Sequence, residues 1–142
     1  MRILSACYLI VVLAGIVSCV SHSPESRLYQ RLGGPSGVDA IVYQLLVSIS
    51  QDDRVVDRFS GVDIEKFRVG FAQYICSVSD GGCTYTGDSM QQIHAGHQYT
   101  ATEFNAIVIN LIRAMEHEKV PTQAQNELLK RLAPSYRDVV YQ

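Results

Sequence analysis

The sequence predicts an all-α protein, and three observations lead to that prediction. Apolar residues recur at steps of three and four along four long stretches, which is the spacing of a helix face. Capping residues precede these stretches, and glycine or proline marks several of their ends. No stretch alternates apolar and polar residues as a half-buried strand does. With 142 residues, the chain has the length of one compact domain.

The first long helix is expected to follow a short one. A brief helix over 24–31 ends at Gly33-Gly34, because glycine adopts the left-handed conformation that closes helices. Ser36 and Asp39 then resemble a capping box with aspartate in place of glutamate. The apolar stripe over 38–49 forms one face of the helix that they begin.

Two elements are expected in the middle of the chain. A short turn of helix covers 52–58, and we interpret Asp52 at its start as a capping residue, because anionic side chains are favoured there. Asp63 caps the next helix, whose apolar stripe covers 64–78. A turn-rich segment follows it.

Capping signals also place the next two helices. Asp88 and Gln91 cap a short helix that reaches into the nineties. Thr100 and Glu103 form a clear capping box, and the stripe over 104–115 behind it has nearly ideal helical spacing.

The last helix starts at Thr122 with Gln125, after a break at Val120-Pro121, and Pro134 kinks or ends it. The stripes over 67–78 and 104–115 are wide enough to pack across each other. Helices that cross steeply leave room for a buried ligand between them.

The pattern of the N-terminal residues is typical of a targeting segment. Arg2 precedes an apolar run over 3–16 that is shorter than the roughly 20 residues of a membrane span and ends in small residues. Residues 16–19 (IVSC) resemble a bacterial lipobox, in which cleavage before Cys19 is followed by acylation of its thiol. We therefore expect a signal peptide over 1–18, a spacer over 19–27 and a lipoprotein on the periplasmic face of a membrane. A plain signal peptide and an uncleaved anchor are the alternatives.

The cysteines fit this expectation. Cys7 lies within the signal and Cys19 would carry lipid, which leaves Cys76 and Cys83 for a disulfide in an oxidising compartment. The alternative is two unpaired small apolar residues. A zinc site is disfavoured, because zinc needs four ligands and the spacing is not CxxC.

Composition and motifs exclude several function classes. The net charge of −2 comes from 12 basic and 14 acidic residues without a basic cluster, so no nucleic-acid partner is expected. The chain carries no nucleophile-elbow, zinc-protease, phosphate-loop or dinucleotide-binding motif. His94 stands out because it lies on the apolar side of a short helix. At this point two interpretations of His94 remain open: a hydrogen-bonded histidine in the core, and a metal ligand.

The four phenylalanines suggest what a metal-ligating His94 would serve. Each falls at an interior-facing position near the expected helix crossing, and a single axial imidazole within an apolar slab is what a haem requires. The four are Phe59, Phe67, Phe71 and Phe104.

The order of several short motifs resembles the group 1 truncated haemoglobins, the two-on-two helical globins. The resemblance covers about 29–140 and implies a globin domain over 28–142. The motifs that carry it are 29–34 (YQRLGG), 59–64 (FSGVDI), 81–82 (GG), 85–90 (YTGDSM), 93–96 (IHAG), 120–121 (VP) and 132–134 (LAP).

The resemblance assigns the iron ligand. His94 matches the proximal ligand of the family, and His97, three residues later, is its only competitor. Phe59 matches the phenylalanine that packs against the porphyrin. Lys66 and Tyr85 match positions that contact the haem propionates.

The chain departs from the family on the distal side. Many members place tyrosine and glutamine where this sequence has Leu46, Phe67 and Phe71, and Gly70 replaces an alternative donor. The expected distal pocket is therefore apolar, which weakens oxygen binding and disfavours nitric oxide dioxygenation, although Tyr43 or Tyr74 can supply a donor by swinging in. Whether the protein is an enzyme stays open.

Together these features predict a protein that binds haem b and reversibly binds diatomic gases (oxygen, nitric oxide, carbon monoxide) at a five-coordinate iron. The alternatives are a gas sensor acting through a separate partner, a haem carrier, and a haem-free structural lipoprotein. The sequence identifies no reductase or signalling partner.

Overall fold

A computed structural model describes residues 27–142. The expected signal peptide, the lipidation of Cys19 and the start of the 24–31 helix lie outside the described residues. Within 27–142 the prediction of an all-α fold is confirmed: the structure has no strand, and its one isolated bridge joins Tyr99 and Val140. No helix in this range is long and apolar enough to cross a membrane.

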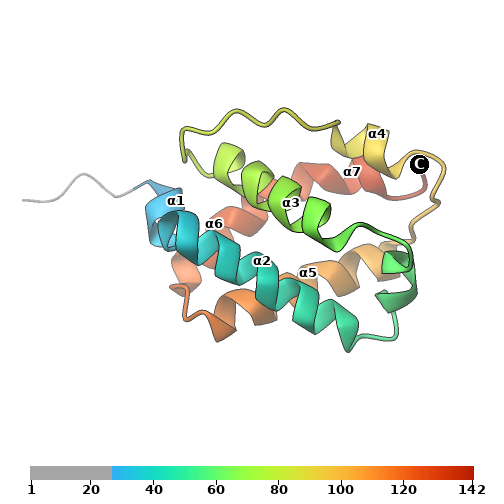
Figure 1. Cartoon of the computed structure of the whole chain (residues 1–142), viewed down its shortest axis with the longest axis horizontal. Coiled ribbons are helices and arrows are strands. Elements are labelled where there is room, and N and C mark those ends of the chain that lie inside the picture. The colour runs from blue at the N-terminus through green and yellow to red at the C-terminus, as the bar shows by residue number, and fades with distance from the viewer. Residues whose placement is uncertain (1–26) are drawn as a thin grey trace, which may run out of the picture.

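Four long helices form two crossed pairs, and short helices connect them (Figure 1). α2 packs against both α3 and α5, and α6 contacts α1, α3 and α5. The C-terminal α7 lies beside the short α4. The elements are α1 (Leu28–Arg31), α2 (Gly34–Ser50), η1 (Val56–Phe59), α3 (Ile64–Val78), α4 (Met90–His94), α5 (Ala101–His117), α6 (Thr122–Leu132), η2 (Ala133–Ser135) and α7 (Tyr136–Val139).

The start of α2 differs from the prediction. Gly33 is the N-cap, with φ at 92°, and no side chain caps the helix, so the capping box of Ser36 and Asp39 was wrong. A β-carbon on Gly37 would overlap the carbonyl of Leu32, so glycine lets the end of α1 approach α2 closely. Asp39 instead accepts a hydrogen bond from Arg68 of α3.

Two of the other predicted caps are confirmed. Asp63 accepts from the backbone N–H of Lys66 at the start of α3, and Thr100 and Glu103 form a reciprocal capping box on α5. The cap of α4 was misplaced by one residue, since Ser89 and Gln92 form the box.

The last helix begins at Thr122, as predicted. Its N-cap is Pro121 and no side chain caps it, and Gln125 Nε2 donates to the carbonyl of Val120. The prediction at Pro134 is confirmed: α6 ends at Leu132, and Pro134 lies in the 3-10 turn that redirects the chain into α7.

Asp52 caps a turn as we predicted, but the helix itself starts later. Asp52 Oδ1 accepts from the backbone N–H of Arg54 at 3.1 Å, the turn of helix begins only at Val56, and the Asp52 side chain is buried. It accepts from Arg54 Nε and Nη2 at 2.8 and 2.6 Å and from Asn110 Nδ2 of α5 at 2.8 Å. The guanidinium of Arg54 is the main cause that holds the pKa of Asp52 far below its usual range. This buried group ties the end of α2 to α5.

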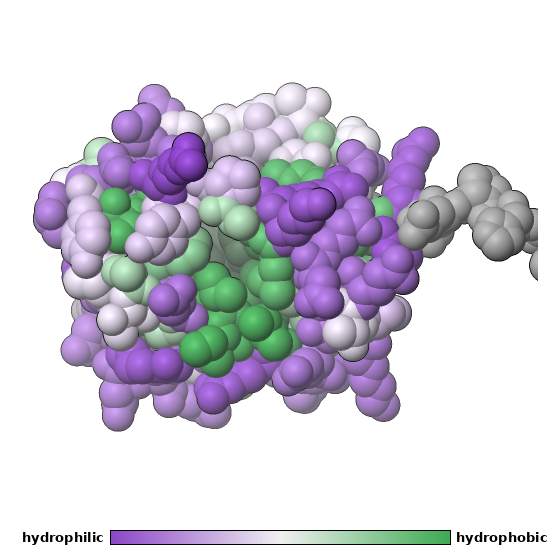
Figure 2. All heavy atoms as spheres, turned by 180° about the vertical axis from the view of Figure 1, so that it is seen from behind, coloured by the Kyte–Doolittle hydropathy of each residue, from purple (hydrophilic) through white to green (hydrophobic). Residues whose placement is uncertain are grey.

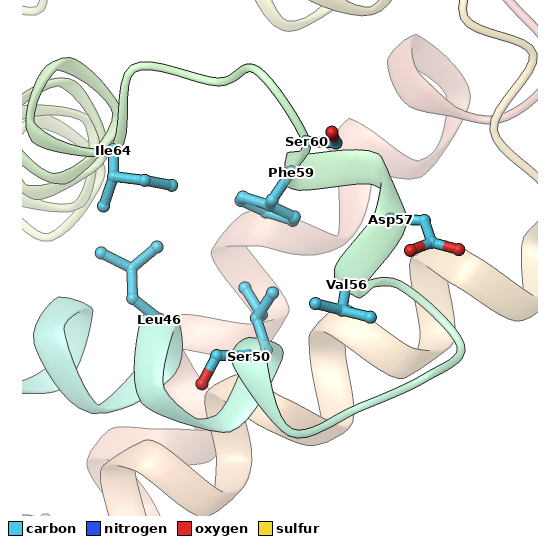
Figure 3. Close-up of a pocket in the computed structure, with 8 residues that line it drawn as sticks. Leu46, Ser50, Val56, Asp57, Phe59, Ser60 and Ile64 are labelled. Atoms are coloured by element: carbon cyan, nitrogen blue, oxygen red, sulfur yellow. The ribbon is translucent and has the colours of Figure 1, made fainter.

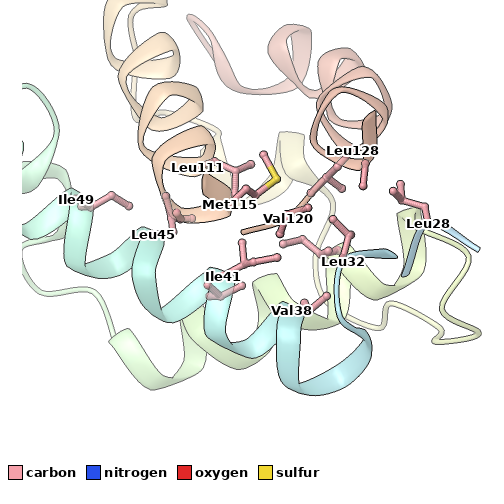
Figure 4. Close-up of a cluster of buried hydrophobic side chains, with 14 of the residues drawn as sticks. Leu28, Leu32, Val38, Ile41, Leu45, Ile49, Leu111, Met115, Val120 and Leu128 are labelled. Atoms are coloured by element: carbon pink, nitrogen blue, oxygen red, sulfur yellow. The ribbon is translucent and has the colours of Figure 1, made fainter. Parts of the chain in front are cut away.

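The apolar core lies where α1, α2, α5 and α6 meet (Figure 4). The buried face along α2 contributes several of its large side chains, and α5 and α6 contribute others. Its largest fully buried residues include Leu28, Leu32, Ile41, Leu45, Ile49, Ile75, Met115 and Leu128. The core therefore occupies one end of the fold and leaves space on the other side, between α3, α4 and α5.

Candidate functional site

A cavity of about 710 Å³ lies between α3, α4 and α5. This volume falls within the range of small-molecule and cofactor sites, roughly 300–1,000 Å³. The side chains around it are mostly apolar. On the face turned away in Figure 1, hydrophobic residues gather around a hollow (Figure 2).

Phenylalanine rings of α3 and of the neighbouring η1 form one wall of the cavity, which we call the α3 wall. Phe67 packs edge-on against Phe59, with ring centroids 5.3 Å apart, and stacks on Phe71 at 5.6 Å. The row continues through Tyr74 to Tyr85. Phenylalanine offers no hydrogen-bond donor, so the first three rings present an apolar surface to the cavity.

His94 ends α4 on the opposite wall. Its Nδ1 donates to the carbonyl of Met90 at 2.7 Å, because a carbonyl can only accept. That bond fixes the tautomer and leaves Nε2 as the ring nitrogen available to a metal. Burial is the main cause that lowers the pKa of His94, so the imidazole is neutral at pH 7 and able to ligate.

Tyr99 follows His94 in the chain and packs against its ring. The two ring centroids lie 5.4 Å apart with an interplanar angle of 73°. The guanidinium of Arg58 lies 4.9 Å from the Tyr99 centroid, and Arg58 Nε donates to Glu103 Oε1 at 2.6 Å. All four side chains line the cavity.

Polar residues also line the cavity. Lys66 and Tyr85 are among them, and the Tyr85 hydroxyl donates to the carbonyl of Asp88 at 3.0 Å. Burial raises the pKa of that hydroxyl. A disulfide joins Cys76 of α3 to Cys83, with Cα atoms 5.7 Å apart, and so ties the segment that carries Tyr85 to α3.

A smaller cavity of about 420 Å³ lies between α2, η1 and the start of α3. Leu46, Val56 and Ile64 point toward one another there, with Phe59 between them (Figure 3). Leu46 thus lines this cavity, whereas Leu45 lines the larger one. The sequence reasoning did not single out Leu45.

The larger cavity brings together seven of the eight predicted cofactor residues, all except Leu46. These are Phe59, Lys66, Phe67, Phe71, Tyr85, His94 and Phe104. Sequence reasoning missed Arg58 and Tyr99, which also line the cavity. Their signal was weak, because an arginine beside a phenylalanine and a tyrosine in a loop have no distinctive spacing.

The donor set fits haem better than a bare metal ion. Within residues 27–142, no three histidine, cysteine or acidic side chains come together to hold an ion. One neutral imidazole facing an apolar slab of space is the set that a haem uses, since the porphyrin supplies the other four nitrogens. His97 is exposed and does not line the cavity.

The sequence profile of the bacterial-like globins matches residues 27–140. The chain belongs to the bacterial-like globins. Membership of this family implies a haem cofactor, in agreement with the donor set. The predicted family and cofactor class are thereby confirmed.

Named relatives of this globin are group 1 truncated hemoglobins. The protein GlbN of Mycolicibacterium paratuberculosis is 25% identical over 119 residues, which cover 84% of this chain and 88% of the relative. GlbN of a Synechocystis species is 29% identical over 123 residues, which cover 82% and 99%.

Solved structures show the same fold. Truncated hemoglobin of Tetrahymena pyriformis in its Fe(III) form has a TM-score of 0.79 and 23% identity, covering 82% of this globin and 99% of that chain. The 2/2 hemoglobin of a Synechococcus species, solved with covalently attached heme, has a TM-score of 0.76 and 24% identity, covering 81% and 98%. The two-on-two arrangement predicted from the sequence is therefore confirmed.

Proposed function

We propose that this globin binds haem b through His94 and reversibly binds diatomic gases, namely oxygen, nitric oxide and carbon monoxide. One observation carries the proposal: the Nδ1 bond to the Met90 carbonyl leaves Nε2 of a cavity-lining, neutral imidazole for the metal. Haem, when bound, supplies an iron with one position open to a gas. Nε2 of His94 would hold the iron.

The α3 wall supports a five-coordinate iron with a weak hold on oxygen. Phe59, Phe67 and Phe71 carry no atom that ligates a metal or donates a hydrogen bond. A hydrogen bond to a partly charged acceptor, such as bound oxygen, contributes about 1.5–3 kcal/mol to its stability, and an apolar wall cannot donate one. This disfavours nitric oxide dioxygenation, which needs a retained oxygen.

Absorption spectra test the proposal. The ferric, ferrous and carbon monoxide forms of the wild type should show a haem bound one to one, five-coordinate when ferrous. His94→Ala should lose stoichiometric haem or the histidine-ligated spectrum, and the matched control His97→Ala should keep both. The opposite pattern would move the ligand to His97. A six-coordinate ferrous spectrum without added gas would contradict the apolar wall.

Haem carriage is the second candidate, and one feature favours it. None of the residues of α4 is buried, so the helix that carries His94 has few apolar contacts to hold it. Haem transfer to an excess of apomyoglobin decides between the two functions. If haem transfer to apomyoglobin is much faster than the dissociation of bound gas, haem carriage is favoured. If haem transfer is slow, gas binding is favoured.

Attachment to a membrane is a separate proposal that rests on the lipobox-like residues 16–19. Cells fed a labelled fatty acid should incorporate it into the wild type and not into Cys19→Ser. Equal labelling of both would refute lipidation of Cys19. A wild type that is released without label would indicate a plain signal peptide.

A further inference from the structure

We propose that Tyr99 is a positioning residue that fixes the plane of the His94 imidazole. The proposal rests on ligation by His94, because it concerns how that ligand is aimed. It adds a determinant outside the α3 wall, in the loop that joins α4 to α5.

The imidazole needs a second contact to be fixed. Its Nδ1 bond to the Met90 carbonyl holds one edge of the ring and leaves the plane free to rock about that bond. The α4 backbone provides little restraint, since none of its residues is buried. The edge-to-face contact with Tyr99, at 5.4 Å and 73°, supplies the missing restraint.

Tyr99 is itself held by its backbone and by its ring. Its carbonyl accepts from the N–H of Tyr141 at 2.9 Å, and it forms a parallel bridge with Val140. The Arg58 guanidinium packs over its ring at 4.9 Å, a favourable cation–π distance. A ring bound on both sides in this way stays in place and can orient its neighbour.

Arg58 is anchored in turn, so the chain of contacts has a fixed end. Its Nε donates to Glu103 Oε1 at 2.6 Å, and its Nη1 donates to the carbonyl of His97 at 3.2 Å. Glu103 also accepts from the N–H and hydroxyl of Thr100 at 2.8 and 2.7 Å. The loop between α4 and α5 is therefore tied to η1.

The ring of Tyr99, not its hydroxyl, does the positioning. Within residues 27–142 the hydroxyl makes no hydrogen bond, whereas the ring contacts His94, His97 and Arg58. This provides a matched pair of variants. Tyr99→Phe keeps the ring and removes only the hydroxyl, and Tyr99→Leu keeps an apolar side chain and removes the ring.

The main test uses the haem-loaded full chain and the iron–imidazole stretching band in the Raman spectrum of the ferrous form. The wild type and Tyr99→Phe should give the same narrow band. Tyr99→Leu should shift and broaden it, and should speed haem transfer to apomyoglobin by about 10- to 100-fold, the usual effect of losing an outer-shell partner of a metal ligand. An unchanged band in Tyr99→Leu would overturn the proposal.

Two further measurements keep the test decisive. If Tyr99→Leu retains no haem, Arg58→Ala is measured in its place. This variant should broaden the iron–imidazole band, because the Tyr99 ring is less well held. An unchanged band in Arg58→Ala counts against the proposal. Ring-current shifts of the His94 protons in the apoprotein should persist in Tyr99→Phe and vanish in Tyr99→Leu. This readout does not need haem, so a failure of ligation by His94 is distinguishable from a failure of the ring contact.

Discussion

The two walls of the cavity are built from different chemistry. The α3 wall is a row of stacked phenylalanines on a 15-residue helix, with a disulfide at its end. The α4 wall is a five-residue helix without a buried residue, held by hydrogen bonds, one ion pair and the C-terminal backbone. One wall is fixed by packing and a covalent bond, and the other by polar contacts that water can replace.

This difference separates two properties of a haem site. We expect the α3 wall to set what an iron-bound ligand meets, because Phe59, Phe67 and Phe71 carry no donor. The α4 wall sets how firmly and at what angle the imidazole is held. Regions with few buried apolar contacts open at a lower free-energy cost than the core. We therefore expect substitutions in α3 to change gas selectivity and substitutions around α4 to change haem retention.

The largest expected effect comes from putting a donor into the apolar wall. Phe67→Gln should slow oxygen release by about 10- to 150-fold if its amide reaches the ligand, the equivalent of about 1.5–3 kcal/mol. Carbon monoxide release should change much less, because that ligand carries little charge. Stopped-flow measurement of both release rates checks this, with Phe67→Leu as the control without a donor.

Leu46→Tyr sharpens the same comparison. Its side chain lies in the smaller cavity, so it should slow oxygen release less than Phe67→Gln does. A larger effect from Leu46→Tyr would mean that the two cavities join around the ligand. Slow oxygen release already present in the wild type would reveal a donor, such as Tyr74, in the α3 wall.

Removal of the Cys76–Cys83 disulfide, which ties the end of the α3 wall, should have the next largest effect. The Cys76–Cys83 pair closes a short loop, since the two residues are 7 apart, and the chain-entropy model gives about 2.5 kcal/mol for such a loop. The double variant Cys76→Ala, Cys83→Ser should unfold at correspondingly lower urea. The wild type with reductant should match it. Wild-type protein recovered with two free thiols would contradict the disulfide.

The smallest expected effect lies in the ion pair of the α4 wall. Arg58 is the main cause that lowers the pKa of Glu103 to about 2, so the pair stabilises the fold fully above the ordinary carboxyl pKa of about 4.5 and loses this contribution as the pH falls toward 2. Glu103→Gln should cost under about 1 kcal/mol at pH 7, because the pair lies near the surface. Urea unfolding should show this difference vanish as the pH approaches 2. A difference that grows in acid would contradict the assignment.

The sequence predicted the parts of the fold that depend on short-range chemistry. The Asp63 cap and the Thr100–Glu103 capping box are local, so their spacing alone located the starts of α3 and α5. The start of α2 failed, because it depends on the left-handed backbone of Gly33, with φ at 92°, and on the close approach of Leu32 to Gly37, which a capping-box pattern does not encode. The hydrogen bond from Asn110 to the Asp52 carboxylate was also missed, since the two residues lie 58 residues apart in the chain.

The candidate site divides in the same way. Phe67, Phe71 and His94 follow from helical spacing and from the resemblance to truncated haemoglobins, and the cavity contains all three. Tyr99 and Arg58 were missed because their importance comes from their contact with each other, across 41 residues of chain. A one-residue offset between Leu45 and Leu46 decides which cavity each lines, and periodicity cannot resolve it.

The position of the apolar core has a consequence for the order of assembly. Leu28, Ile41, Met115 and Leu128 belong to a packed core that includes no residue of α4, although Phe59 and Phe71 pack against it (Figure 4). Most of its residues do not line the cavity, so we expect the chain to reach a native-like shape first and receive its cofactor afterwards. The cofactor then binds to a protein that is already folded. The rate of this binding should depend on the opening of the short α4 segment and not on the folding of the whole protein.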